Sequence, residues 1–409
     1  MAKKKSTNKK VVKAATKMAK KDPKTFLIVL IVMILIIGLG IGGYFLYIKF
    51  LAPQNEEGSS KPEESSLVVN SSSDKPISSS RPTTSWAEGD VAPIDINFLE
   101  LGNKYTGDCT FIKAGDTDIL IDAGSRNGSA STISAFVDTY CTDGKLEYVI
   151  ATHAHQDHIA GFVGTNSAEG ILKHYKIGTL IDFSQTNATS AVYNNYVSLR
   201  DEKVTSGDIE HHYYANECVK EENGAKKIYD LAPGITMEIL DQKYYYEKSS
   251  DENDHSVCTL FSQGNNHYLF TGDLEEKGEA SLVALNDLPE VELFKGGHHG
   301  SYTANTDTLL NVIKPKTICI CCCAGSDEYT SNEDNMFPAQ AAVNRMAKWT
   351  DKIYVTTVVS DNEKGYASMN GNINFHSDKG ELYVVTGSNN NTILKETDWF
   401  RNKRTWPSA

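Results

Sequence analysis

The most restrictive feature of the sequence is a group of metal-competent side chains that directly follows a predicted buried strand. The run Leu146–Thr152 has the composition of a strand, and His153, His155, Asp157 and His158 follow it within six residues. His153 and His155 project together because strand side chains alternate, while the other two turn towards a neighbouring position. This segment can therefore supply ligands to two adjacent cations. Imidazole and carboxylate donors suit zinc, manganese or iron rather than calcium.

The uncharged run of residues 26–48 is the second feature, and it predicts a single transmembrane helix. Its 23 residues cross roughly 30 Å of hydrocarbon as a helix, and the run is longer than the apolar region of a cleaved signal peptide. Residues 1–24 hold ten lysines and one aspartate, a net charge of +9, so the total of −13 leaves about −22 for the remaining chain. The positive-inside rule makes residues 1–25 a cytoplasmic basic tail. We expect a protein of the cell membrane with its C-terminal domain outside the cytoplasm. A cleaved signal, or a basic arm that binds nucleic acid, is the alternative.

The composition and periodicity of the remaining chain divide it into a linker, one domain and a tail. Residues 49–92 are rich in Ser, Pro and Glu and are expected to form a disordered linker. From residue 93 to residue 387, short β-branched runs alternate with stretches of helical period, which predicts one domain. Residues 388–409 form a C-terminal tail, whose Trp399, Phe400 and Trp406 are expected to pack back on the domain. Overall, 40% of residues are hydrophobic and 23% charged, which excludes collagen-like and disulfide-scaffold proteins.

Several ordered motifs together resemble one known family. THAHQDHIAG at 152–161 is preceded by NFLELGNKYTGDCTFIKAGDTDILIDAGS and followed by FTGDLEEKGEASLV and then ELFKGGHHGSYTANTDTLLNVIKPKTICI. Over residues 93–386 the chain resembles the metallo-β-lactamase superfamily, and within it the C-terminal domain of ComEC-type competence proteins. The resemblance implies an α+β fold, a four-layer αββα sandwich with a two-metal site at one edge of its sheets. Here the domain would follow a transmembrane helix and a linker.

The resemblance also implies a role for each matching residue. His153 and His155 would hold the first metal and Asp157 and His158 the second. Asp273 would bridge both, because two neighbouring dications repel and need anionic charge between them. Either His298 or His299 would complete the second site. Asp122, at the end of a predicted strand, would accept a hydrogen bond and orient a ligand histidine or its loop.

The third ligand of the first metal departs from the usual superfamily pattern. Where a histidine is common, this sequence reads DENDHSVCTLF. Asn253 and Ser256 match the competence-type pattern, so His255 is either a ligand or a polar residue beside a strand. The resemblance places Lys295 and Ser301 near the metals, where a cation and a hydroxyl could hold phosphate oxygens.

These features predict a binuclear metallo-hydrolase with two divalent ions, zinc first and manganese or iron as alternatives. Asp157, Asp122, Lys295 and Ser301 are the candidate catalytic residues, and a metal-bound hydroxide would be the nucleophile. The nearest subfamily favours a phosphodiesterase or nuclease acting on nucleic acid or a cell-envelope polymer, with no nucleotide cofactor. The charge of about −22 opposes a polyanionic substrate. Hydrolysis of a lactam or ester, or a non-catalytic envelope docking module, remains an alternative, and the sequence identifies no protein partner.

Overall fold

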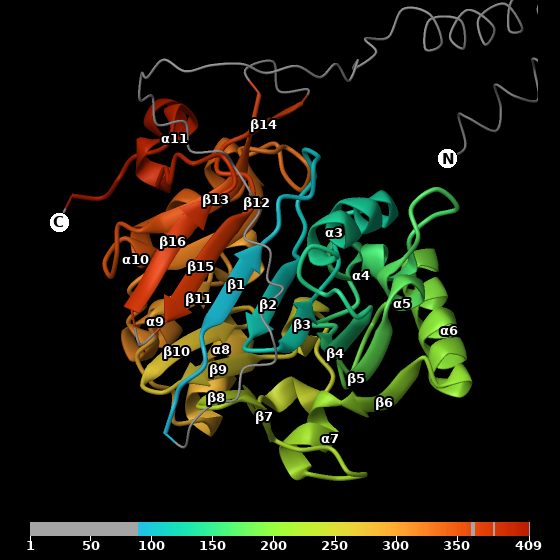
Figure 1. Cartoon of the computed structure of the whole chain (residues 1–409). Coiled ribbons are helices and arrows are strands. Elements are labelled where there is room, and N and C mark those ends of the chain that lie inside the picture. Colours follow the sequence, from blue (N-terminus) through green and yellow to red (C-terminus); the bar gives the residue numbers. More distant parts are fainter. Residues whose placement is uncertain (1–88, 361–364, 379–380, 409) are drawn as a thin grey trace, which may run out of the picture. The chain divides into compact units, whose positions relative to one another are not determined.

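Two eight-stranded sheets form the body of the computed structural model, which describes residues 89–360, 365–378 and 381–408 (Figure 1). None of the helices within these ranges is both long and apolar enough to cross a membrane. The predicted span at 26–48, the basic tail before it and the linker up to residue 88 lie outside the described residues.

The first sheet joins an antiparallel half to a parallel half. Its order is β16-β15-β1-β2-β3-β4-β5-β6, with β3 to β6 parallel to one another. The strands are β1 Ile94–Phe98, β2 Thr110–Ala114, β3 Thr117–Ile121, β4 Lys145–Ile150, β5 Lys176–Asp182, β6 Ile209–Tyr214, β15 Ile373–Asp378 and β16 Glu381–Thr386. The expected strand before the histidine motif is thus β4, at the centre of the parallel half.

The second sheet has the same mixed construction. Its order is β14-β13-β12-β11-β10-β9-β8-β7, with β10 to β13 parallel and the remaining pairs antiparallel. The strands are β7 Ile228–Ala232, β8 Ile235–Ile239, β9 Thr259–Gln263, β10 Asn266–Phe270, β11 Leu293–Lys295, β12 Ile318–Ala324, β13 Ile353–Val359 and β14 Tyr366–Ser368. Each parallel half directs its strand ends towards loops that carry polar side chains.

One apolar core fills the space between the sheets and continues under the helices on the outer face of the first sheet, and a second lies on the outer face of the second sheet. Phe98 of β1 and Phe270 of β10 stack across the sheets with ring centroids 6.1 Å apart. Along β12, Cys319 and Cys321 belong to the first core, whereas Ile318, Ile320 and Cys322 belong to the second. This alternation is expected of a strand that is covered on both faces.

Helices cover the outer faces of the sheets (Figure 1). Beside the first sheet lie α3 Ala130–Val137, α4 Gln156–Val163, α5 Ile171–His174, α6 Ala191–Ser206 and α7 Ala215–Lys220. The second apolar core includes residues of α8 Glu276–Leu285, α9 Asp307–Ile313, α10 Gln340–Met346 and α11 Asp398–Lys403. In the tail, Phe400 is buried and Trp399 and Trp406 pack against this core, as the sequence predicted. The α+β sandwich of two sheets is confirmed.

Candidate metal centre

The polar loops that follow several strands meet in one buried group. Asp122 directly follows β3, and residues 151–155 connect β4 to α4. Asp273 lies in the turn after β10, and the loop 296–301 follows β11. Since neighbouring parallel strands share an edge for their carboxyl ends, these loops gather at one end of the sandwich. The local fold thus brings residues from distant parts of the sequence within ligand distance of each other.

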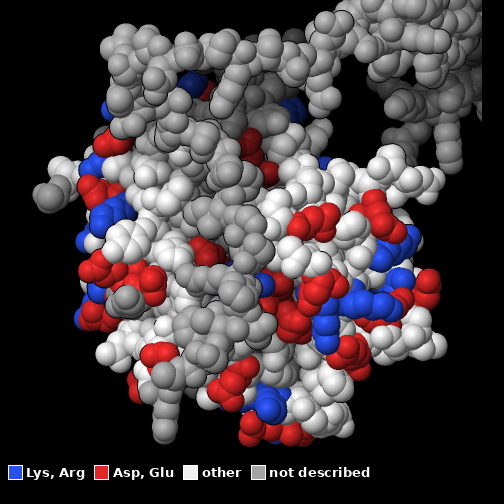
Figure 2. All heavy atoms as spheres, in the orientation of Figure 1, with Lys and Arg blue, Asp and Glu red and all other residues white. Residues whose placement is uncertain are grey.

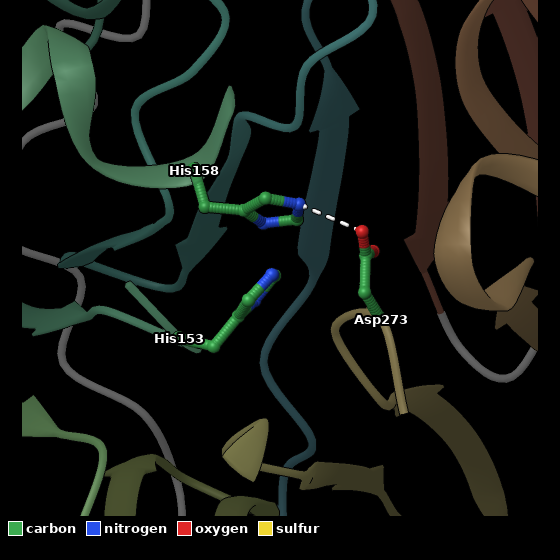
Figure 3. Close-up of side chains that lie close together, drawn as sticks. All are labelled: His153, His158 and Asp273. Atoms are coloured by element: carbon green, nitrogen blue, oxygen red, sulfur yellow. Dashed lines mark hydrogen bonds and ion pairs between the residues drawn. The ribbon is translucent and has the colours of Figure 1, made fainter. Parts of the chain in front are cut away.

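His158 is held between the carboxylates of Asp122 and Asp273, and Figure 3 shows its contact with Asp273. Its Nδ1 lies 2.7 Å from Asp122 Oδ2, and its Nε2 lies 3.0 Å from Asp273 Oδ2. A carboxylate at Nδ1 keeps a proton there and leaves the Nε2 lone pair for a cation. The ligand atoms of His153, His158 and Asp273 all lie within 4.8 Å of one another. His153 Nε2 is also 2.9 Å from His155 Nδ1, so both expected histidines of the first metal are adjacent.

His299 has the same arrangement as His158 on the other side of the group. Its Nδ1 lies 2.8 Å from the carbonyl oxygen of Cys321, which fixes the proton on that nitrogen. Its Nε2 lies 3.0 Å from Asp273 Oδ2, 3.4 Å from Asp157 Oδ2 and 3.3 Å from His158 Nε2. Two histidine Nε2 atoms and two carboxylate oxygens therefore point at the same small volume.

This donor set fits metal ions better than it fits a metal-free protein. Two Nε2 lone pairs 3.3 Å apart repel unless a proton or a cation lies between them. Four carboxylates of the group are almost fully buried, namely those of Asp108, Asp122, Asp157 and Asp273, whereas Lys295 is the one lysine or arginine that contacts them among the described residues. Lys295 compensates one of the four charges. The remaining buried negative charge favours cations here, either metal ions or the imidazolium forms of His158 and His299, because the neighbouring carboxylates raise the pKa of both histidines well above the ordinary value. Imidazole nitrogen with carboxylate oxygen is a donor set for zinc, manganese or iron.

The two histidines of Figure 3 respond to this field in opposite directions. Burial disfavours the imidazolium of His158, but the carboxylates of Asp273 and Asp122 outweigh burial and raise its pKa well above the ordinary value. For His153, burial and the neighbouring His158 and His155 lower the pKa well below the ordinary value. The surroundings of His153 therefore favour the neutral imidazole, whereas those of His158 favour positive charge.

Lys295 lies at the metal group, but its ammonium faces protein oxygens. It forms an ion pair with Asp108, lies 3.0 Å from the carbonyl oxygen of Gly272 and 3.4 Å from Asp273 Oδ1, and its side chain is 3% exposed. Asp108 also lies 3.3 Å from His299 Nδ1 through its Oδ1. Sequence reasoning missed Asp108. Its signal was a carboxylate immediately before a buried strand, which on its own is also typical of a turn.

Tyr329 is a second residue that sequence reasoning missed. Its hydroxyl donates a 2.6 Å hydrogen bond to Asp157 Oδ2 from the loop between β12 and α10. The neighbouring Glu328 accepts a 2.8 Å hydrogen bond from the backbone nitrogen of Thr106 and forms an ion pair with Arg126. These contacts fix the loop beside the metal group. No motif or periodicity in this polar loop distinguishes the tyrosine.

The structure distinguishes the two adjacent histidines that the sequence left open. His298 and His299 have φ values of 45° and 52°, and this left-handed turn directs their side chains to different sides. His299 enters the group, whereas His298 Nδ1 lies 3.0 Å from Glu275 Oε1. Ser301 is buried, and its hydroxyl lies 2.8 Å from that of Thr303. Neither His298 nor Ser301 is among the residues whose ligand atoms converge.

His255 also lies apart from the converging ligand atoms. Its Nε2 accepts a 3.2 Å hydrogen bond from the backbone nitrogen of Ser249, and its Nδ1 lies 3.4 Å from Glu252 Oε2. Both ring nitrogens thus have protein partners. Ser256, which matches the competence-type pattern, instead accepts a 3.0 Å hydrogen bond from the backbone nitrogen of Asp273 and so positions that carboxylate.

The sequence is similar to known proteins over part of its length. Residues 102–175 match the family model described as the Metallo-beta-lactamase superfamily. Two curated relatives then confirm the resemblance to ComEC-type proteins. ComE operon protein 3 of Bacillus subtilis (strain 168) is 27% identical over 182 residues, which are 43% of this chain and 20% of that protein. Recombination protein 2 of Haemophilus influenzae is 27% identical over 222 residues, 54% of this chain and 23% of that protein.

The match therefore spans only about a fifth of the length of each curated relative. Among solved structures, the metallo-beta-lactamase fold protein YhfI from Bacillus subtilis has a TM-score of 0.39 and 9% identity. It covers 71% of this chain and 99% of its own.

Proposed function

We propose that this chain is a binuclear metal-dependent phosphodiesterase held at the membrane by residues 26–48. The observation that carries the proposal is the convergence of His158 Nε2, His299 Nε2 and Asp273 Oδ2, whose mutual distances are 3.0 to 3.3 Å. His153 and His155 would hold one ion, and Asp157, His158 and His299 the other, with Asp273 shared between them. When bound, the two divalent ions would activate water and stabilise negative charge on a phosphoryl oxygen.

The surrounding residues would keep the ligands in place. Asp122 and the carbonyl oxygen of Cys321 fix the protons of His158 and His299 on Nδ1, which leaves each Nε2 free. The Tyr329 hydroxyl holds one oxygen of Asp157. This arrangement is the kind that pre-organises a site before substrate binds.

The buried position of Lys295 favours a role different from the one expected from the sequence. Its ammonium already contacts Asp108 and Asp273, so it would compensate their charge rather than hold a phosphate oxygen of the substrate. Ser301, buried and hydrogen-bonded to Thr303, would likewise stabilise the loop that carries His299. The substrate would then approach the two ions from the accessible side of the site, near His155.

A phosphodiester is the substrate class that the relatives favour. Recombination protein 2 has a name that refers to recombination, a process that acts on nucleic acid. ComEC-type relatives also favour an association with the membrane, in agreement with the apolar run at 26–48. A single phosphodiester group is compatible with the charge of the chain, because two divalent ions would attract it locally.

The test is an activity screen of the full-length chain with zinc or manganese. The substrates are bis(p-nitrophenyl) phosphate, single-stranded DNA and a cephalosporin. We expect turnover of a phosphodiester that Asp157→Ala abolishes. Asp398→Ala is the matched control, because that side chain is 95% exposed on α11 and should leave turnover unchanged. Turnover of the lactam alone would overturn the assignment, and fewer than two equivalents of bound metal would contradict a binuclear site.

A further inference from the structure

A cleft of about 690 Å³ opens beside the histidine loop. Its walls are residues 154–156 of that loop, residues 187–190 before α6, and residues 250–252. His155, which lies 2.9 Å from His153, belongs to the lining, so the cleft begins where the expected first metal would be held. A group attached to a phosphate at the metals can extend into this space.

The chemistry of the lining is polar without positive charge. Neutral side chains such as Gln156, Asn187, Thr189 and Ser250 form most of it, Asp251 and Glu252 are acidic, and no lysine or arginine is among the residues that line it. On the face drawn in Figure 2, most groups of described lysines and arginines lie beside acidic side chains. Proteins that bind a chain of phosphates neutralise them with lysine and arginine. The cleft does not offer this, whereas hydroxyl and amide groups suit a ligand rich in hydroxyls.

The shape of the cleft is fixed by contacts behind its walls. Glu252 accepts hydrogen bonds from the backbone nitrogens of Ala154 at 3.3 Å and Asn187 at 2.6 Å, and from the Thr186 hydroxyl at 2.8 Å. It therefore joins all three segments of the lining. The side chain is 7% exposed, and its oxygens are largely used within the protein.

The segment before α6 is anchored at both ends. Asp182, at the end of β5, forms a 2.7 Å ion pair with Arg200 of α6. Ser190 caps α6 by accepting a 3.1 Å hydrogen bond from the backbone nitrogen of Tyr193. A wall held in this way is already formed before a ligand binds, which lowers the entropic cost of binding.

We propose that this cleft binds an uncharged, hydroxyl-rich leaving group, so that the substrate is a phosphodiester of a polyol or sugar rather than a stretch of nucleic acid. This inference rests on the proposed phosphodiesterase function. In the reaction, the oxygen of water bonds to phosphorus and the bond from phosphorus to the polyol oxygen breaks. The polyol leaves with one proton from the water, and the other product is a phosphate monoester.

The experiment compares two phosphodiesters on the full-length chain, glycerophosphoglycerol and a tetrathymidylate. We expect a higher kcat/KM for glycerophosphoglycerol in the wild type. Thr189→Lys adds a cation to the cleft and should move the ratio of the two kcat/KM values about threefold towards the tetrathymidylate, the effect of one partly screened charge pair. Thr205→Lys is the matched control, because it adds the same charge to an exposed position near the far end of α6 and should leave the ratio unchanged.

Binding provides a second readout that does not depend on turnover. Calorimetry with the hydrolysis-deficient Asp157→Ala protein should show tighter binding of glycerophosphoglycerol than of the tetrathymidylate, and Thr189→Lys in that background should reverse the order or narrow the gap. Absence of turnover for bis(p-nitrophenyl) phosphate and both diesters would remove the proposed function itself. Turnover with the tetrathymidylate preferred, or an equal effect of the two lysine variants, would overturn only the inference about the cleft.

Discussion

Replacing Asp122 by asparagine tests how the protein fixes its histidine ligands. The carboxylate accepts three hydrogen bonds: 2.7 Å from His158 Nδ1, 2.7 Å from the Thr152 hydroxyl and 2.8 Å from the Thr152 backbone nitrogen. An amide of the same shape has only one oxygen. Asp122→Asn must therefore present its NH₂ group either to His158 or to the backbone nitrogen of Thr152.

Both orientations carry a cost that can be estimated. If the NH₂ faces His158, the imidazole must accept at Nδ1 and carry its proton on Nε2, the atom 3.0 Å from Asp273 Oδ2, so its lone pair is lost to a metal. Loss of such a partner lowers metal affinity by about 10- to 100-fold, which is about 1.4 to 2.7 kcal/mol. If the NH₂ faces Thr152 instead, a buried donor is left unpaired and the fold loses about 1 to 3 kcal/mol.

Competition of the full-length protein with a chromophoric chelator measures zinc affinity, and urea unfolding of the metal-free protein measures stability. We expect Asp122→Asn to lose affinity, stability or both by these amounts, while Asp398→Asn at an exposed site changes neither. Unchanged zinc affinity together with unchanged metal-free stability would refute the assignment of Asp122 as the residue that orients His158.

Three further predictions concern the hydroxyl at the site, a buried carboxylate away from it, and the metal itself. Tyr329→Phe removes the 2.6 Å hydrogen bond to Asp157 and should lower kcat by about three- to tenfold, the worth of one hydrogen bond, with zinc affinity changed much less; steady-state kinetics and a zinc titration distinguish this from a loss of metal. Burial raises the pKa of Asp118 to about 6, although Lys113 at 2.8 Å acts in the opposite direction. The folded protein therefore loses stability as the pH rises from 4 through 6, because Asp118 must then ionise in its buried position. Asp118→Asn does not ionise, so urea unfolding should show it gaining about 1 to 3 kcal/mol relative to the wild type between pH 4 and pH 7.5. Addition of EDTA to the zinc-loaded protein should lower Tm by roughly 5 °C, and by clearly less in Asp273→Asn, which calorimetry would detect; an equal fall in both proteins would count against Asp273 as a ligand.

The strand before the histidine motif could be predicted from the sequence, whereas the buried β5 and the exposed edge strand β6 were both missed. The expected strand at Leu146–Thr152 is β4. β6, with the sequence IEHHYY, was missed because it is an edge strand with several exposed side chains and no apolar face to give a period. α4 was missed because it begins inside the histidine motif, where ligand residues replace the usual pattern of a helix.

Some groups of the candidate site belong to a recognisable sequence motif, and the others do not. The resemblance to the metallo-β-lactamase superfamily already implied that the histidine loop and Asp273 would meet at one site. The carbonyl oxygen of Cys321 belongs to the backbone, and its contact with His299 leaves no trace in residue type. Asp108 and Tyr329 act through single contacts that only the folded chain creates, which is why neither belongs to a recognisable pattern.

The choice between His298 and His299 shows why two identical neighbours could not be separated without the backbone. Both have positive φ, a conformation that costs a residue with a side chain roughly 1 to 2 kcal/mol. His299 makes four close contacts in the metal group that can offset this cost, whereas His298 is part-exposed and has Glu275 and Thr303 as its partners. The contacts of His299 can thus offset the cost of a left-handed backbone at two successive residues, a conformation that directs the imidazole of His299 inward. The turn thereby brings His299 among the converging ligand atoms while His298 stays outside them.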